Sequence, residues 1–303
     1  MFSDLLSEGG LSLDRLQSFC LVAQAGGVTK AAKGDPTKQS LFSRQVKELE
    51  EFFGAELMRR KGRGIVLTPA GERLNVVARE CFASLLDFKR GCKGLPVEIV
   101  IGAGESLIRW LLIPKLAEVQ KSLPNARLKF LNLPTNELVR RLSDGLIDFG
   151  VVRKDAVTRP LRVASLGMMG YSLFLPAGAK AGADGREHDA KVLDGVALAT
   201  LEGEGSFRQE LAAVARRHKF RLNIQLECSS FPLVASALET GGMAAVLPSI
   251  ARVELGRAGI KEVKAAPLKS FGREICLVWN PRLLRIRTAL EKAERIFGQA
   301  FRI

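Results

Sequence analysis

Apolar positions recur at helical spacing through the first fifty residues of the chain. Ser12 can cap a helix that ends at Gly26-Gly27, and Thr29 can cap a second, short helix over residues 30–33. A third helix is predicted over residues 38–53 and is stopped by Gly54. Its predicted buried stripe is Phe42, Val46, Leu49 and Phe53. A short helix, a tight turn and a helix with a polar, basic outer face are typical of a helix-turn-helix.

Two short strands are predicted after the third helix, at residues 56–59 and 65–67. The glycines of Arg60-Lys61-Gly62-Arg63-Gly64 allow a tight turn between them, and the basic side chains can meet a phosphate backbone. Such a hairpin alone is as often a solvated loop, but its place behind a helix-turn-helix favours DNA contact. The predicted DNA-binding residues are Lys38, Gln39, Ser40, Ser43, Arg44, Lys47, Arg59, Arg60 and Arg63.

A long amphipathic helix is predicted from Pro69 to about Lys89, with Thr68 as its cap. Its apolar residues follow one another at steps of four, three, four and three, which is the period of a two-helix seam. This stripe either packs on its own chain or pairs with a second subunit. It consists of Leu74, Ala78, Cys81, Leu85 and Phe88. Gly91, Gly94 and Pro96 then mark a domain boundary.

From residue 97 onward, apolar strands alternate with amphipathic helices, which predicts a mainly parallel α/β architecture. Strands are expected at residues 97–103, 128–133, 149–152, 171–175, 196–201, 224–228, 243–247 and 274–279. Helices are expected through Leu107, Leu111 and Leu116, over 136–144 with Thr135 as the cap, and over 207–218, 233–239 and 282–301. The predicted domains are therefore 1–68, 69–95 and 96–303.

Charge and composition add little to this picture. The chain has 46 Lys and Arg against 32 Asp and Glu, a net charge of +14. Residues 97–303 carry 31 of the basic and 21 of the acidic residues, so the overall charge is no evidence for DNA binding by the first domain. No apolar run approaches the ~20 residues of a membrane span, and no signal-peptide pattern is seen. We therefore expect a cytoplasmic protein without a membrane partner.

Cysteine and histidine usage disfavours an enzyme. The five cysteines lie far apart without CxxC spacing, and His188 and His218 are the only histidines. No nucleophile, nucleotide-binding or metal-binding motif is found in the right context. We expect no catalytic residues, no metal and no cofactor.

Residues 16–74 resemble the winged helix-turn-helix of the LysR-type transcriptional regulators, and the order and spacing of the motifs match that family without a gap. The motifs are Leu16-Gln17-Ser18-Phe19, Thr29-Lys30-Ala31-Ala32, Ser43-Arg44-Gln45-Val46-Lys47-Glu48-Leu49-Glu50 and Leu67-Thr68-Pro69-Ala70-Gly71. The family usually has leucine at Asp35, a small aliphatic residue at Thr37 and serine at Lys38. This departure predicts a changed turn, with Thr37 as the helix cap.

Residues 97–303 are similar to the effector-binding domain of the same family, which has two periplasmic-binding-protein-like α/β halves. The matching motifs are Leu138 with the run from Gly145 to Gly150, and the run from Gly241 to Pro248. The resemblance implies halves at residues 97–162 with 270–303 and at 163–269, a hinge of two crossover strands, a linker helix that pairs subunits, and a homodimer or homotetramer.

Ligands of such folds bind between the halves, at strand C-termini and helix N-termini. The expected effector-binding residues are Gly104, Glu105, Ser106, Thr135, Gly203, Ser206, Ser229, Ser230 and Phe231. Ser106, Thr135, Ser206 and Ser230 can equally be plain helix caps. The Glu105 carboxylate would compete with an acidic effector, so an amine-bearing or neutral ligand is an equally good expectation. Arg153 can supply a counter-charge or be a solvated surface residue.

The resulting hypothesis is a regulator that binds double-stranded DNA and responds to a small-molecule effector of unknown identity. A solute-binding protein and an enzyme that uses the C-terminal cleft are the rivals from other classes. The presence of a helix-turn-helix and the absence of a signal-peptide pattern argue against a solute-binding protein. The lack of a nucleophile with a base argues against an enzyme. A further alternative is a small-molecule-binding protein whose diverged helix-turn-helix no longer reads DNA.

Overall fold

The computed structural model describes residues 5, 9–62, 64–179 and 187–303 and divides into two compact units. The first unit comprises residues 1–95 with 144–146, and the second comprises 96–143 with 147–303. Within the described residues, no helix has both the length and the apolar character required to cross a membrane.

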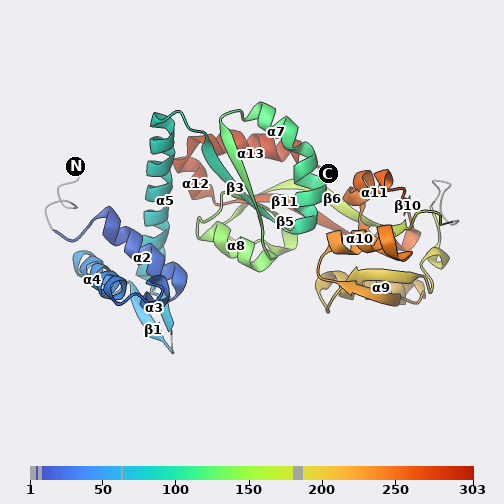
Figure 1. Cartoon of the computed structure of the whole chain (residues 1–303), viewed down its shortest axis with the longest axis horizontal. Coiled ribbons are helices and arrows are strands. Elements are labelled where there is room, and N and C mark those ends of the chain that lie inside the picture. The colour runs from blue at the N-terminus through green and yellow to red at the C-terminus, as the bar shows by residue number, and fades with distance from the viewer. Residues whose placement is uncertain (1–4, 6–8, 63, 180–186) are drawn as a thin grey trace. The chain divides into compact units, whose positions relative to one another are not determined.

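The first unit contains a helix-turn-helix followed by a two-stranded hairpin (Figure 1). Its elements are α2 (Leu13–Ala25), α3 (Val28–Ala31), α4 (Pro36–Phe53), β1 (Met58–Lys61) and β2 (Gly64–Leu67). Ser12 and Gly26 cap α2 as predicted, and Gly54 caps α4. The core consists of apolar side chains from α2, α4 and the segments that follow them, among them Phe19, Val22, Val46, Leu49 and Leu57.

Two details of these helices differ from the prediction. The N-cap of α3 is Gly27, so Thr29 lies inside the helix and does not cap it. Phe53 is 38% exposed rather than buried, because it is the last residue of α4 and lies beyond the core. It contacts the ring of Phe52 edge-on at 4.9 Å.

The turn before α4 is capped by Asp35, not by Thr37 as predicted. One carboxylate oxygen of Asp35 accepts hydrogen bonds from the backbone N–H groups of Thr37 at 2.9 Å and Lys38 at 3.2 Å. Pro36 occupies the first helical position, where a missing N–H leaves no hydrogen bond unmade. The helix therefore starts two residues earlier than predicted.

The long helix α5 (Pro69–Cys92) begins at the predicted cap, where the Thr68 hydroxyl accepts from the Gly71 N–H at 3.1 Å. A Cβ at Gly71 would lie 2.0 Å from the carbonyl oxygen of Leu57, so only glycine fits this close approach. The predicted apolar stripe divides into two parts. Leu74 and Ala78 pack into the core of the first unit, whereas the remainder of the stripe, Cys81, Leu85 and Phe88, is exposed.

The second unit contains one nine-stranded sheet in the order β4-β3-β5-β11-β6-β9-β7-β8, with β10 paired to β6. The strands are β3 (Val97–Ala103), β4 (Ala126–Asn132), β5 (Phe149–Arg153), β6 (Arg162–Leu175), β7 (Ala197–Leu201), β8 (Asn223–Cys228), β9 (Ala244–Pro248), β10 (Lys261–Val263) and β11 (Gly272–Trp279). β3 pairs in parallel with β4 and β5, and β7 pairs in parallel with β8 and β9. The long strands β6 and β11 are antiparallel to their neighbours and connect these two parallel groups.

Helices cover both faces of the sheet in each group, giving two lobes (Figure 1). Lobe one contains β3, β4, β5 and β11 with α6 (Glu105–Leu107), the π-helical turn η1 (Ile108–Leu112), η2 (Ile113–Lys115), α7 (Leu116–Ser122), α8 (Thr135–Ser143), α12 (Pro281–Ile286) and α13 (Thr288–Ala300). Lobe two contains β7 to β10 with α9 (Ser206–His218), α10 (Phe231–Gly241) and α11 (Arg252–Arg257). β6 runs through both lobes. β10 and α11 were not predicted.

Three helices of the second unit differ from the prediction. The helix after β3 is interrupted at η2 by Pro114, which has no N–H to continue the α-helical ladder. Thr135 is the first residue of α8 and not a residue before it. The helix predicted over 282–301 is two helices, because Arg287 has an extended backbone (φ −111°, ψ 90°).

A buried ion pair lies at the break at Arg287. Its guanidinium pairs with the carboxylate of Asp148 and donates through Nη2 to the carbonyl oxygen of Glu98 at 2.9 Å. Asp148 also accepts the backbone N–H of Val100 at 2.7 Å. Both charged side chains are less than a tenth exposed, so each needs these partners. The extended backbone at Arg287 accompanies this pairing of α12–α13 with β3 and β5.

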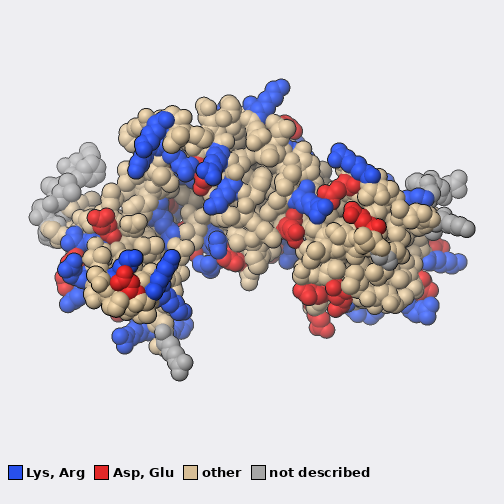
Figure 2. All heavy atoms as spheres, viewed as in Figure 1, with Lys and Arg blue, Asp and Glu red and all other residues tan. Residues whose placement is uncertain are grey.

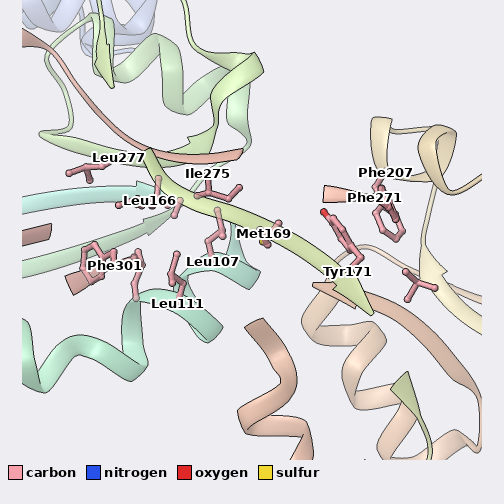
Figure 3. Packing of buried hydrophobic residues seen from close by; sticks show 14 of the residues in the cluster. Leu107, Leu111, Leu166, Met169, Tyr171, Phe207, Phe271, Ile275, Leu277 and Phe301 are labelled. Atoms are coloured by element: carbon pink, nitrogen blue, oxygen red, sulfur yellow. The ribbon is translucent and has the colours of Figure 1, made fainter. Parts of the chain in front are cut away.

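One hydrophobic cluster extends from lobe one into lobe two along β6 (Figure 3). Leu166, Met169 and Tyr171 of β6 belong to it, as do Phe301 of lobe one and Phe207 of lobe two. A second link is made by Trp110 of η1, which packs into the other core of lobe two. The indole Nε1 of Trp110 donates to Glu254 of α11 at 3.1 Å, and Arg109 pairs with the same carboxylate at 2.9 Å.

Candidate nucleic-acid interface and ligand cleft

The outer face of α4 is polar, basic and accessible. Lys38, Ser40, Ser43, Arg44 and Lys47 are all exposed. Gln39 is half-buried, and its amide oxygen accepts from the Thr29 hydroxyl at 3.4 Å. Six of the predicted DNA-binding residues therefore share one helix, with Gln39 at the side nearest α3.

The basic residues of this face are only loosely paired. Arg44 Nε lies 3.7 Å from Glu48 Oε1, and Lys47 Nζ lies 3.7 Å from Glu51 Oε1. Glu48 is also paired with Arg15 of α2. Exposed pairs at these distances contribute little to stability, so Arg44 and Lys47 can exchange their partners for phosphate oxygens.

The hairpin is fixed to the helices that precede it. The backbone N–H of Ile65 donates to the carbonyl oxygen of Gly26 at the end of α2 at 3.1 Å. The Glu50 carboxylate of α4 accepts the N–H groups of Leu57 at 2.8 Å and Met58 at 3.2 Å.

Basic side chains of the hairpin are exposed. Arg59 and Arg60 on β1 are accessible, whereas Arg63 lies outside the described residues. Figure 2 shows Lys and Arg side chains gathered around the end of the first unit that carries this hairpin. The helix face and the hairpin thus belong to one anchored substructure.

A cavity of about 580 Å³ lies between the two lobes of the second unit. It is formed by the N-termini of α6 and α8 in lobe one and of α10 in lobe two. The lining residues are Gly104, Glu105, Ser106, Asn132, Leu133, Pro134, Thr135, Leu201, Ser229, Ser230 and Phe231. The structure thus brings together seven of the nine residues that the sequence suggested for the effector site.

The other two residues of that set do not line the cavity. Gly203 lines a separate, open groove of about 540 Å³ on lobe two, with Glu204 and Arg208 among its walls. Ser206 is the first residue of α9, and its hydroxyl accepts hydrogen bonds from Arg153 and Arg273, each at 3.1 Å.

The capping alternative holds for one of the four hydroxyl residues. Ser230 caps α10, with its Oγ accepting the Leu233 N–H at 3.4 Å. Ser106, Thr135 and Ser206 lie inside their helices. Their hydroxyls are therefore not N-caps.

One residue near Ser206, Arg273, escaped the sequence interpretation, whereas Arg153 was considered as a counter-charge. Arg273 of β11 is 91% buried, and Arg153 is half-buried through its contact with Ser206 rather than a solvated surface residue. An arginine at the start of the strand of residues 272–279, before its apolar run from Ile275, was the available signal. Tyr171 of β6 stacks on Phe271 with 4.3 Å between ring centres. Both side chains are labelled in Figure 3. Burial raises the pKa of Tyr171 to about 12, so its O–H stays protonated and neutral.

Comparisons with known proteins agree on one family. Residues 13–72 match the bacterial regulatory helix-turn-helix protein family of lysR type, and residues 94–293 match the LysR substrate binding domain. The HTH-type transcriptional regulator EstR of Acinetobacter baylyi is 26% identical over 79% of this chain and 80% of its own length. A probable nitrogen assimilation transcriptional activator of Synechococcus elongatus is 32% identical, and the match spans 47% of each chain.

Solved structures show the same fold at low sequence identity. A full-length OxyR variant from Pseudomonas aeruginosa superposes with a TM-score of 0.66 at 20% identity, covering 96% of both chains. CbnR in complex with its target DNA gives a TM-score of 0.53 at 20% identity, covering 94% of this chain and 99% of CbnR.

Proposed function

Because the chain belongs to the LysR family of transcriptional regulators, we propose that it is a ligand-responsive regulator that binds double-stranded operator DNA through its first unit. The observation that carries this proposal is the exposed basic face of α4 beside the anchored β1–β2 hairpin. The matched family and the DNA complex of CbnR support it.

In this proposal α4 enters the major groove. Gln39, Ser40, Ser43 and Arg44 would contact base edges or nearby phosphates, because arginine and amide side chains can form paired hydrogen bonds with bases. Lys38 and Lys47 would contact phosphates. Arg59 and Arg60, with Arg63, would hold the sugar–phosphate backbone and fix the register of the helix.

The cavity between the lobes would hold the effector. Helix N-termini with the positive ends of their dipoles border the cavity, and a ligand between the lobes would contact both lobes. It can change the angle between the lobes only if it binds one arrangement more tightly than the other.

The regulator would act as a homodimer or homotetramer in the cytoplasm, where bacterial DNA lies. The exposed half of the α5 stripe supplies a helix–helix seam, and a two-fold dimer matches a two-fold operator.

The test is fluorescence anisotropy of the full chain with the DNA upstream of its own gene, against a scrambled duplex, over a salt series. A preference for the native fragment that persists as salt weakens both complexes is expected. Equal, steeply salt-dependent binding of both duplexes would instead favour a protein whose helix-turn-helix does not read sequence.

Single substitutions separate base reading from phosphate contact. Arg44→Ala should weaken binding to the native fragment by roughly 1–3 kcal/mol and reduce its preference over the scrambled duplex. Arg59→Ala should weaken both complexes alike and lower the salt slope by about one. Arg217→Ala on the exposed end of α9 removes the same charge from the second unit and should change neither quantity.

A further inference from the structure

We propose that the N-terminus of α9, together with Arg153 and Arg273, is a binding site for the oxyanion group of the molecule that the second unit senses. The inference rests on the proposed ligand response and adds the chemical class of the ligand: a small anion such as a carboxylate, sulfate or phosphate.

Arg273 is the first observation. The residue is 91% buried, and its Nη1 donates to the Ser206 hydroxyl oxygen at 3.1 Å. Its Nη2 lies 2.9 Å from a carboxylate oxygen of Glu210. Nε is nevertheless buried without a hydrogen-bond partner among the described residues, and Nη2, although ion-paired with Glu210, makes no well-aligned hydrogen bond. A buried guanidinium with unmade hydrogen bonds is costly, which points to a partner that the protein itself does not supply.

A second guanidinium converges on the same atom. Arg153, at the end of β5, donates through Nη1 to Ser206 Oγ, also at 3.1 Å. Two cations from strands of lobe one thus share one neutral hydroxyl oxygen of lobe two. An oxyanion is a stronger acceptor, because it carries charge and can accept from both arginines at once.

The helix that starts at Ser206 favours an anion at this position. α9 has 13 residues, its N-cap is Gly205 without a side-chain capping bond, and its first turn contains no acidic residue. The first backbone N–H groups of such a helix, and the positive end of its dipole, attract anions.

Two carboxylates compete with a bound anion, but both are solvated. Glu210, opposite Arg273, has a side chain that is 48% exposed, and Asp155, 3.3 Å from Arg153, has one that is 70% exposed. Water screens such exposed pairs, so each carboxylate binds its arginine more weakly than a ligand oxyanion held between the two arginines would.

The site adjoins the cavity between the lobes. Phe207 follows Ser206 and contacts Phe231 edge-on with 4.8 Å between ring centres. Phe231 is one of the residues that line the cavity. A ligand whose oxyanion lies at Ser206 can therefore extend its remaining atoms past Phe231 toward the cavity. Ser206 would then contact the ligand although it does not line the cavity itself.

The test is thermal unfolding of the full chain at constant ionic strength with four anionic probes, acetate, benzoate, sulfate and phosphate. Acetamide and benzamide serve as neutral counterparts, and chloride sets the baseline. We expect a saturable rise in Tm with at least one anion and none with the amides. Comparison of the two carboxylates with sulfate and phosphate shows which oxyanion geometry the site takes.

Variants locate the response. Arg273→Met should weaken the apparent affinity for the active anion roughly ten- to a hundredfold, since it removes charge-assisted hydrogen bonds. Arg273→Lys, which keeps the charge but not the planar fork, provides a second variant if the first does not fold. Glu210→Gln should strengthen binding, because it removes a competing carboxylate. Arg217→Met on the same helix, exposed and remote from Ser206, is the matched control.

Two results would overturn the inference: no anion raising the Tm of the wild-type chain, or an equal response from the wild type and from the Arg273 variants. Neither outcome would be confused with failure of the proposed function, because thermal unfolding uses no DNA. Sequence-specific DNA binding without an anion response would leave the regulator intact and remove only the oxyanion site.

Discussion

Arg287, between α12 and α13, and Arg273, on β11, are both buried arginines of the second unit, yet their surroundings differ. Arg287 pairs with the buried Asp148 and also donates to a backbone carbonyl, so its positive charge is compensated inside the protein. Arg273 pairs through Nη2 with the half-exposed Glu210, and its buried Nε has no hydrogen-bond partner among the described residues. The first arrangement stabilises lobe one, whereas the second is suited to an incoming anion.

The single tyrosine of the chain allows a direct titration at this scale. Burial raises the pKa of Tyr171 from 10.0 to about 12. The nearby positive charge of Arg273 acts in the opposite direction but is the smaller effect. Because folding raises this pKa, the unfolded chain loses the proton first. The contribution of Tyr171 to stability is therefore complete below pH 10 and is lost as the pH rises toward 12.

Absorbance at 295 nm measures this ionisation without interference from another tyrosine. We expect a midpoint near pH 12 for the folded chain and near pH 10 in denaturant. A midpoint near pH 10 in the folded state would show that the ring is solvated. Tyr171→Phe, which should abolish the signal, is the control.

At the scale of elements, helix ends account for most differences between expectation and structure. The stripe of α4 was predictable because Val46 and Leu49 are apolar at helical spacing. The start of α4 was not, because Asp35 and Thr37 can both cap a helix and the choice depends on which carbonyl and N–H groups the turn presents. At the break, Arg287 pairs with Asp148, 139 residues away in sequence, a contact that no local pattern reveals.

The cavity lining was largely predictable for a related reason. Within each lobe the ends of parallel strands meet on one edge, which groups Ser106 with Thr135, and the family resemblance to a two-lobed fold places Ser230 opposite them. The arginines around Ser206 could not be grouped in this way. Arg273 lies on a crossover strand, 67 residues from Ser206 in sequence, and no strand-end pattern links the two residues.

The Asp35 cap provides a prediction at this scale. Asp35→Ala removes both hydrogen bonds to the first turn of α4 and should cost roughly 1 kcal/mol. In a unit of this size that corresponds to a fall of about 4–8 °C in the Tm of the first unit, measured by differential scanning calorimetry. Asp35→Asn keeps a side-chain acceptor and should remain close to the wild type. An unchanged Tm in Asp35→Ala would mean that the cap is dispensable.

At the scale of the whole molecule, the positive charge and the exposed apolar surface lie in different parts of the chain. Residues 97–303 carry most of the positive excess, although the proposed DNA contacts lie in the first unit. The exposed apolar residues of α5 form a continuation of a stripe whose first part is buried. We infer that a second copy of the chain covers this surface.

Phe88→Glu tests that surface. Phe88 is 73% exposed, so the substitution should leave the fold of one chain intact while placing a charge in the seam between two. Sedimentation velocity should show a shift toward monomers at micromolar protein concentration, and affinity for operator DNA should fall with it. Val253→Glu, at an exposed apolar residue of α11, is the control. If Phe88→Glu sediments as the wild type does, the subunits associate through another surface.

Trp110 limits how far the lobes can move. Its indole belongs to lobe one by sequence but is buried in the core of lobe two, so separating the lobes would expose it to water. Exposing ~200 Å² of aromatic surface costs about 5 kcal/mol, a large part of the ~8 kcal/mol that a micromolar ligand provides. A wide separation of the lobes would therefore take up most of the free energy of binding of such a ligand. An effector would therefore act on DNA binding through small rotations of one lobe relative to the other that keep Trp110 buried.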